Sequence, residues 1–360
     1  MTHPHTLYSS LVEYPKQHWD ETVSNRWVSL CDGLAAYEPP IKAWNLRRDR
    51  KWELVSALQK SIRRGDKTVA LSLVAAMESM PEDYAYFWRR LCVIACEDVG
   101  PADDVLALFT VACCTIFHPK KTGSDNKRLW SFLVEKMCDL PTRSRIYCSF
   151  GAVELLSTSR LGKLSDQDEF ICKAILDHIG SVYGPSNLFE AWQRKNDWRA
   201  EGLLRFVGLR LPFEMARSEA VIPRPEMLFD LPDYCYDMHT RVGLKALQKS
   251  VKGVVGADAI REFFRQHRIK NAHRALGEML FFVEGGRMKG ELMYEPLCEL
   301  EQRMHCQKWG LAWDRWSCLR VLVEKAVRQG VFNRAREEVL TQCYGQEKLQ
   351  LIATEESTGE

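Results

Sequence analysis

The sequence predicts an all-α protein made of many helices in two parts. Apolar residues recur at helical spacing over long stretches, as Val55, Leu58 and Ile62 do after Trp52. Alternation of apolar and polar residues over five or more positions is scarce, so strands have little support. Turn signals rich in glycine and proline separate the helical stretches. Together these observations favour a multi-helix fold.

Five segments have the clearest helical pattern, and turn signals separate several of them. The segments are residues 19–34, 52–62, 84–95, 272–283 and 316–326. The turns are residues 64–66, 100–101, 123–125, 184–186 and 285–286. Asp66 is expected to cap the helix after the first turn, and Asp103 and Asp104 are expected in the first turn of the helix that follows Pro101.

Four prolines interrupt the chain between residues 211 and 234 and leave no continuous helix there. We therefore predict a domain boundary at this point. The predicted parts are an N-terminal arm (1–40), a first helical domain (41–211), a proline-rich linker (212–233), a second helical domain (234–353) and a frayed tail (354–360).

Composition and charge limit the classes of function. The 360 residues are 46% hydrophobic and 27% charged, which suffices for a sizeable core and excludes a disordered or low-complexity chain. The net charge is only +2, so nucleic-acid binding would require a local basic patch. No run is long enough to span a membrane, and residues 1–10 do not resemble a signal peptide. We expect a soluble, cytoplasmic protein without membrane contact.

The 13 cysteines are expected to be reduced thiols. Their number is odd, and Cys92 and Cys96 lie one helical turn apart in an apolar pattern. Cysteine packs in such places as a small hydrophobe. The Cys and His residues around 235–239 and 298–306 lack the paired ligand motifs of a metal site. We therefore predict no disulfide framework, no metal and no other cofactor.

Residues 51–108 are the most informative stretch. Its strings are Ser-Ala-Leu-Gln-Lys-Ser-Ile-Arg-Arg-Gly-Asp (56–66), Arg-Arg-Leu (89–91) and Glu-Asp-Val-Gly-Pro-Ala-Asp (97–103). In this order and spacing, the strings resemble the C-terminal helical region of clamp-loader-like AAA+ ATPases of the MgsA/RarA type, over about residues 51–155. In that family the region is the collar that holds subunits together, next to an ATPase that works at stalled replication forks. The resemblance implies a collar-like first domain.

The resemblance also implies interface residues, which are Arg89, Arg90, Glu97 and Asp98. It does not extend to ATP hydrolysis, because the sequence has no Gly-x-x-x-x-Gly-Lys-Ser/Thr motif to hold phosphates. Taken without the family, residues 97–104 simply end one helix and begin the next. The alternative is a divalent-cation site built from Glu97, Asp98, Asp103 and Asp104.

Two basic clusters are candidates for phosphate contact. The first comprises Arg47, Arg48, Arg50, Lys60, Arg63 and Arg64, near Trp44 and Trp52. The second comprises Arg261, Arg265, Arg268, Lys270 and Arg274, beside Phe263 and Phe264. Cations next to aromatic rings suit single-stranded nucleic acid, because bases stack on the rings while the cations follow the backbone. The alternative for each cluster is a solvated helix face.

A polar segment after the prolines contains Asp237, His239, Thr240 and Arg241. These side chains could form an active site in which His239 is the base and Asp237 orients it. The structural alternative, which we favour, is that Asp237 or Thr240 caps the helix that begins near Val242. No nucleophile or dinucleotide motif supports an enzyme.

The string Ala-Leu-Gln-Lys-Ser occurs twice, at residues 57–61 and 246–250. Chance similarity between two amphipathic helices is the favoured interpretation, and a distant duplication is the alternative.

The sequence favours a non-enzymatic accessory protein of DNA replication, recombination or repair. We expect it to bind a clamp-loader-like ATPase, or a second copy of itself, through the collar-like helices, and to contact DNA locally, with a preference for single strands. The alternatives are an enzyme that processes nucleic acid or nucleotides around residues 237–241, and a phage-type protein that interferes with a host ATPase.

Overall fold

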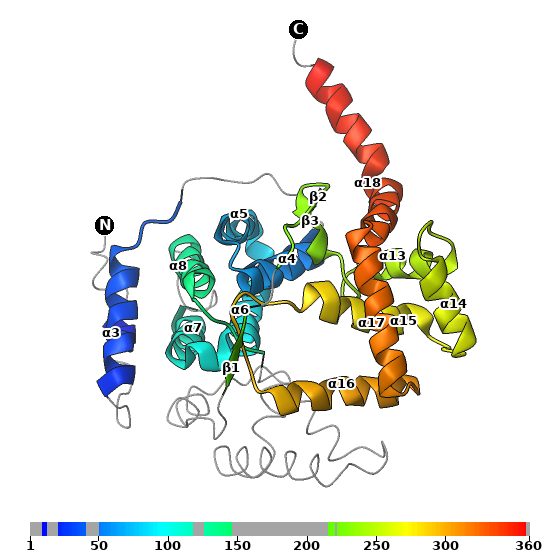
Figure 1. Ribbon diagram of the computed structural model, residues 1–360. Helices are drawn as coiled ribbons and strands as arrows, with labels where there is room; N and C mark the ends of the chain where they lie inside the picture. Colours follow the sequence, from blue (N-terminus) through cyan, green and yellow to red (C-terminus); the bar gives the residue numbers. More distant parts are fainter. Residues whose placement is uncertain are drawn as a thin grey trace. The chain divides into compact units, whose positions relative to one another are not determined.

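The computed structural model describes residues 9–12, 21–40, 50–117, 126–145, 215–219 and 222–357 (Figure 1). Helix dominates these residues, so the predicted all-α fold is confirmed. Strands within the described part form two short antiparallel pairs. Strand β1 (Ala216–Ser218) pairs with β4 (Glu291–Met293), with Ala216 opposite Met293, and β2 (Met227–Leu228) pairs with β3 (Leu231–Pro232).

Helices occupy the described residues of all five segments that the sequence predicts as helical. The α-helices are α2 (Ser9–Val12), α3 (Glu21–Ala36), α4 (Lys51–Arg64), α5 (Lys67–Glu78), α6 (Tyr84–Ile94), α7 (Asp104–Phe117), α8 (Asn126–Asp139), α13 (Arg241–Lys252), α14 (Asp258–Gln266), α15 (Ala272–Leu280), α16 (Glu295–Trp309), α17 (Trp313–Arg328) and α18 (Val331–Ser357). Short 3₁₀ segments are η2 (Pro81–Asp83), η4 (Gly100–Ala102) and η5 (Asp233–Cys235). Two π-helical segments, η3 (Ala95–Val99) and η6 (Phe281–Gly285), continue α6 and α15.

Helix α18 extends beyond its predicted end. It continues to Ser357 and so includes the first four residues of the predicted tail (354–360). None of the described helices combines the length and the apolar composition that crossing a membrane requires.

The chain divides into two compact units whose boundaries differ from the predicted domains. Unit 1 comprises Met1–Asp49, Ser61–Ile222 and Met288–His305, and unit 2 comprises Arg50–Lys60, Pro223–Arg287 and Cys306–Glu360. Thus the first part of α4 belongs to unit 2 and not to the predicted first domain (41–211). Residues 288–305 belong to unit 1, although they were expected in the second.

The core of unit 1 is rich in aromatic rings and includes the predicted N-terminal arm. Helix α3 packs on α7, and the buried Trp27 ring lies edge-on to Phe109 with 5.0 Å between centroids. The Trp27 indole N–H donates to the Leu11 carbonyl at 2.9 Å. Residues 21–36 therefore belong to the core rather than to a separate arm. Trp88 on α6 and Trp130 on α8 are both buried, and their rings meet edge-on.

The core of unit 2 forms where α13 packs on α15 and α18, and where α17 packs on α14, α15 and α18. Apolar side chains at helical spacing face this core, for example Leu276 on α15 and Trp316 and Leu319 on α17. Phe263 and Phe264 on α14 are also buried. The apolar stripe of each amphipathic helix therefore faces inward, as its sequence period predicts.

Three of the described helices end in the same motif, in which one residue adopts a left-handed backbone. Its N–H bonds the carbonyl three residues back, and the next N–H bonds the carbonyl five residues back. The left-handed residue is Gly65 after α4 (φ +67°), Gly310 after α16 (φ +63°) and Arg268 after α14 (φ +51°). Glycine is the usual residue at such an exit because a Cβ is strained there. Arg268 is therefore an exception among these three exits.

Candidate functional site

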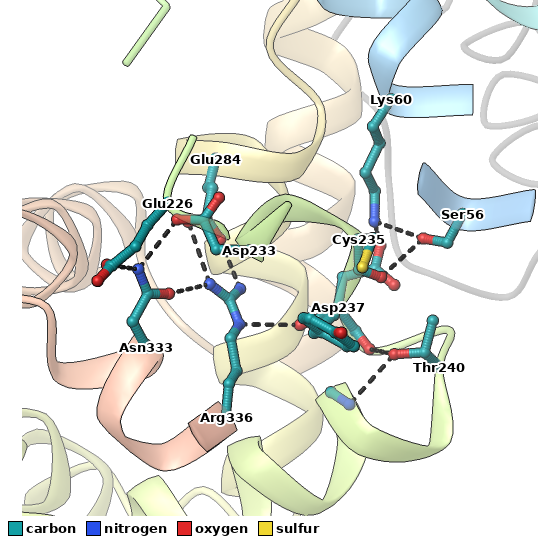
Figure 2. A network of polar contacts seen from close by, with 12 residues as sticks. Ser56, Lys60, Glu226, Asp233, Cys235, Asp237, Thr240, Glu284, Asn333 and Arg336 are labelled. Carbon is teal, nitrogen blue, oxygen red and sulfur yellow. Dashed lines mark hydrogen bonds and ion pairs between the residues drawn. The ribbon is translucent and has the colours of Figure 1, made fainter. Parts of the chain in front are cut away.

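Lys60 on α4 forms a buried ion pair with the polar segment after the prolines. Its ammonium lies 2.8 Å from Asp237 Oδ2 and donates to Ser56 Oγ at 2.8 Å (Figure 2). The Ser56 hydroxyl donates to the Cys235 carbonyl at 2.8 Å. Lys60 and Asp237 are only 3% and 5% exposed. This contact lies inside unit 2 and fixes the first turns of α4 to the 235–237 loop.

Asp237 also orients His239. One carboxylate oxygen accepts the His239 backbone N–H at 2.9 Å, and the other lies 3.0 Å from the ring Nδ1. Burial alone would raise the pKa of Asp237, but the Lys60 ammonium and the His239 ring hold it well below its usual range. The His239 side chain is 65% exposed. Asp237 is thus an ionised, fully engaged group, and His239 is the accessible member of the pair.

Thr240 caps α13, as the structural alternative predicted. Its hydroxyl oxygen accepts the Gly243 N–H at 3.1 Å, and its hydroxyl donates to the Asp237 carbonyl at 3.1 Å. A Cβ at Gly243 would lie 1.9 Å from that carbonyl oxygen, so only glycine fits. Arg241 begins α13 and is exposed. The structure therefore brings together three of the four residues of the segment and leaves Arg241 facing solvent.

A second buried network, around Arg336 on α18, was not foreseen from the sequence. Its guanidinium donates to Glu284 Oε2 at 2.6 Å, to Asn333 Oδ1 at 2.7 Å and to the Tyr236 carbonyl at 3.0 Å (Figure 2). Asn333 in turn donates to Asp233 at 3.0 Å. Burial and the neighbouring Glu284 raise the pKa of Asp233. No local signal marks Arg336, because an arginine on a polar helix ordinarily faces water.

Arg63 on α4 makes a buried ion pair inside unit 1. Its Nε lies 2.5 Å from Asp98 Oδ1 on η3, and the two residues are 4% and 0% exposed. Of the four predicted interface residues, Asp98 is therefore inaccessible, and its assignment to an interface is wrong. Arg89 is exposed, and Arg90 and Glu97 are half-buried. Burial, and then the charge of Asp98, raise the pKa of Glu97.

The predicted alternative of a divalent-cation site at residues 97–104 has no support in this geometry. Asp98 is engaged by Arg63, and Asp103 pairs with Arg26 at 2.6 Å and accepts the Leu106 N–H at 2.9 Å. Among the described residues, no group of three or more His, Cys, Asp or Glu side chains is arranged to hold a metal ion.

The first basic cluster is largely internal. Arg50, Lys60 and Arg63 are 3–4% exposed, and Arg50 donates to the Tyr236 hydroxyl and to the Phe229 carbonyl at 2.9 Å. The prediction that these three cations contact nucleic acid is wrong, because their charges are neutralised or hydrogen-bonded inside the protein. Arg64 is half-buried, and Arg47 and Arg48 lie outside the described residues.

The second basic cluster lies mostly at the surface. Arg265, Arg268, Lys270 and Arg274 are exposed, whereas Arg261 is half-buried and donates to the Val254 carbonyl at 2.9 Å. Phe263 and Phe264, which were expected to stack on bases, are 7% and 4% exposed and lie in the core. At this cluster, the predicted preference for single strands thus loses the aromatic rings on which it depended, whereas Trp52, near the first cluster, is exposed.

Positive charge is concentrated in residues 241–274. This segment has nine Lys or Arg against two Asp or Glu, a surplus of seven positive charges in a chain of net charge +2. The two acids, Asp258 and Glu262, each bond the arginine three residues further on. In the described part of the chain, no carboxylate pairs with the four exposed cations that we call the basic surface, which are Lys252, Arg268, Lys270 and Arg274.

Two helices contribute to the basic surface at one point. Partial burial lowers the pKa of His273, and the charges of Arg274 and Lys252 lower it further. The end of α13 therefore brings Lys252 close to the start of α15. Arg268 lies in the α14–α15 connection, at the left-handed exit where two other helices have glycine. A strained residue that is retained at a surface is a reason to look for a function there.

A scan against models of known protein families finds no match, and a search of solved structures finds none either. The resemblance of residues 51–155 to the collar of clamp-loader-like ATPases therefore stays a prediction.

Proposed function

We propose that this protein is a non-enzymatic accessory factor of DNA replication, recombination or repair that contacts nucleic-acid phosphates through the basic surface. The observation that carries the proposal is the uncompensated charge of Lys252, Arg268, Lys270 and Arg274. In a nearly neutral chain, these residues are a local concentration of positive charge. It is the arrangement that a polyanion requires.

The chemistry favours contact with the phosphate backbone over reading of bases. The neighbouring Phe263 and Phe264 rings are buried, so they offer no stacking platform. Binding should therefore depend little on sequence or strandedness and strongly on salt. Each phosphate neutralised contributes about 0.7 to 0.9 to the slope of log K against log salt, so four contacts give a slope of roughly three.

Fluorescence anisotropy with short labelled DNA, single- and double-stranded, tests this proposal. The variant Lys252→Glu/Lys270→Glu/Arg274→Glu should lose about tenfold or more in affinity at low salt and have a shallower salt slope. The control is Arg315→Glu/Arg320→Glu, which reverses exposed cations of the same unit that already pair with Asp314 and Glu324. Equal affinities for the two variants would contradict the proposal.

The collar-like helices supply the second part of the proposal, which depends on the sequence resemblance. A clamp-loader-like ATPase, or a second copy of the chain, would bind near the exposed Arg89. Native mass spectrometry of the protein alone and with such an ATPase measures complex formation, and Arg89→Glu should weaken it. A strictly monomeric protein without any complex would rule out this part. If a complex forms, a rise or fall in ATPase turnover distinguishes an assisting protein from an interfering one.

One observation favours a second candidate, an enzyme that processes nucleic acid or nucleotides. The exposed His239 ring is held through Nδ1 by a buried carboxylate, which is how proteins orient a general base. Incubating the protein with labelled oligonucleotides and nucleotides tests it. Any hydrolysis should disappear in His239→Gln, and the absence of product with the unmodified protein removes this candidate.

A further inference from the structure

Helix α13 carries a row of cations on its exposed side. All residues of this helix that are exposed to solvent are Lys or Arg, and the half-buried Lys249 lies between them. Together they form what we call the α13 row, which comprises Arg241, Lys245, Lys249 and Lys252. Successive members are three or four residues apart, so they share one side of the helix, and the buried Ala246 and Leu247 lie on the other. The exposed side of α13 is therefore cationic from its first residue to its last.

The α13 row leads into the basic surface. Helix α15 packs against α13, and a Cβ at Gly277 would lie 3.0 Å from a Leu247 methyl group. The Phe281 ring after α15 meets the His239 ring before α13, so the two helices are antiparallel. The start of α15 therefore lies beside Lys252 at the end of α13. The row and the basic surface share this lysine and are thus continuous.

Most charges of the α13 row have no carboxylate partner. In the part of the chain that the structure describes, no carboxylate pairs with Arg241 or Lys245. The exception in the row is Lys249, whose ammonium lies 2.6 Å from the Glu338 carboxylate on α18. A cation in the first turn opposes the helix dipole, so the charge of Arg241 does not stabilise α13. These charges are therefore available to an external anion.

We propose that the α13 row is the line along which a nucleic-acid backbone binds, from Arg241 to the basic surface. This inference rests on the proposed function and adds the length and direction of the contact. At 1.5 Å per residue the row is about 16 Å long, which corresponds to roughly five nucleotides of one strand of B-form DNA. A mononucleotide or a free phosphate is too short to reach both ends. The ligand is therefore an oligonucleotide or a longer strand.

Fluorescence anisotropy with labelled DNA that is longer than the row tests the inference. The variant Arg241→Gln/Lys245→Gln removes two charges at exposed positions where Gln is also a good helix former. Its affinity at low salt should fall about fivefold, and the slope of log K against log salt should become shallower by about 1.5. The matched control, Arg315→Gln/Arg320→Gln, removes two exposed charges on α17 and should change both values much less. Equal effects of the two variants would overturn the inference.

The basic-surface variant Lys252→Glu/Lys270→Glu/Arg274→Glu distinguishes this inference from the proposed function. If it loses affinity and Arg241→Gln/Lys245→Gln does not, DNA binds the basic surface alone. The inference is then wrong, while the proposed function stands. If the unmodified protein binds no DNA, both are wrong.

Removing the acid that faces the row gives a test that misfolding cannot imitate. Glu338→Gln frees Lys249 and removes a negative charge beside the bound strand, so it should tighten binding about threefold at low salt. The control is Glu337→Gln, since Glu337 is exposed and lies about 100° around the axis of α18 from Glu338. It should tighten binding much less. Equal gains in the two variants, or no gain in Glu338→Gln, would overturn the inference.

Acetylation of the unmodified protein locates the contact without any variant. Bound DNA should protect the exposed Lys245 and Lys252 from an amine-reactive acetylating reagent. The exposed Lys308, on α16, should react at the same rate with and without DNA. Mass spectrometry of the digest measures each rate. Protection of Lys252 without protection of Lys245 would confine the contact to the basic surface and would contradict the inference.

Discussion

Helices α4 and α13 share the string Ala-Leu-Gln-Lys-Ser but use its lysine in different ways. In both copies the Ala, Leu and Ser are buried. Lys60 of α4 is also buried, against Asp237, whereas Lys249 of α13 is 34% exposed and pairs with the exposed Glu338 at 2.6 Å. The shared string thus fixes the helix and its apolar face, and the surroundings decide whether the lysine charge is inside or outside.

The elements that follow the two strings also match in order. Helices α5 and α6 lead from the first copy to the π-helical segment η3, and α14 and α15 lead from the second to η6. Each π-helical segment carries a buried acid that pairs with an arginine, Asp98 with Arg63 and Glu284 with Arg336. The arginines do not correspond, because Arg63 lies on α4 itself, whereas Arg336 lies on α18.

The largest expected effect on stability is that of replacing Lys60, and replacing Lys249 is its matched control. Lys60→Met leaves Asp237 buried without its cation and should lower the free energy of unfolding by about 3–5 kcal/mol. Lys249→Met removes an exposed pair and should cost about 1 kcal/mol or less. Urea unfolding followed by circular dichroism measures both. Similar losses would mean that the two lysines are equivalent and that the comparison fails.

The pH dependence of stability sharpens the same comparison. Because the folded-state pKa of Asp237 lies below the unfolded value, its pair stabilises the protein above about pH 5 and this contribution is lost as the pH falls towards the folded-state pKa. The difference in unfolding free energy between the unmodified protein and Asp237→Asn should therefore shrink from pH 7 to pH 3. A difference that is constant over this range would contradict the assignment.

A smaller effect on stability is expected at Gly243, where the first turn of α13 packs closely against the backbone of Asp237. The corresponding position in α4 is the buried Leu54. In Gly243→Ala the new Cβ must displace a backbone oxygen, which should cost about 3 kcal/mol. Gly253→Ala, at a site with no atom within 4 Å of the new Cβ, should change stability by about 0.5 kcal/mol or less in a thermal melt. An equal response at both sites would refute the steric argument.

The smallest expected effect is at the left-handed residues that end α14 and α4, where substitutions distinguish a change in stability from a change in DNA affinity. Arg268→Gly removes a left-handed arginine and should stabilise the protein by about 1 kcal/mol while lowering affinity for DNA. Gly65→Ala makes the opposite change at the equivalent exit of α4 and should destabilise by at least about 1 kcal/mol, since the new Cβ would also lie 2.9 Å from Arg143. Thermal melts and the anisotropy assay measure both quantities. If Arg268→Gly binds DNA unchanged, Arg268 has no role in the basic surface.

The sequence predicted the helices well because their apolar period is a local property. It did not predict the direction of Lys60 and Arg63, because α4 is buried on nearly all sides and its acids, Asp237 and Asp98, come from other segments of the chain. The prediction that Phe263 and Phe264 are exposed was wrong for a related reason. The two rings are buried by packing between helices, and this packing cannot be inferred from the local pattern of basic and aromatic residues. The exposed cations of residues 268–274 were predictable, since polar connections ordinarily face water.

The π-helical segment η3 determines the direction of Asp98 through its backbone conformation. A π-helical turn holds about one more residue than an α-helical turn, and each residue of an α-helix turns the chain by about 100°. If Ala95–Val99 continued α6 as an α-helix, Asp98 would therefore be rotated by a large part of that angle, and its carboxylate would face away from Arg63. The wider turn of this segment is thus as necessary to the buried ion pair as the two charged side chains.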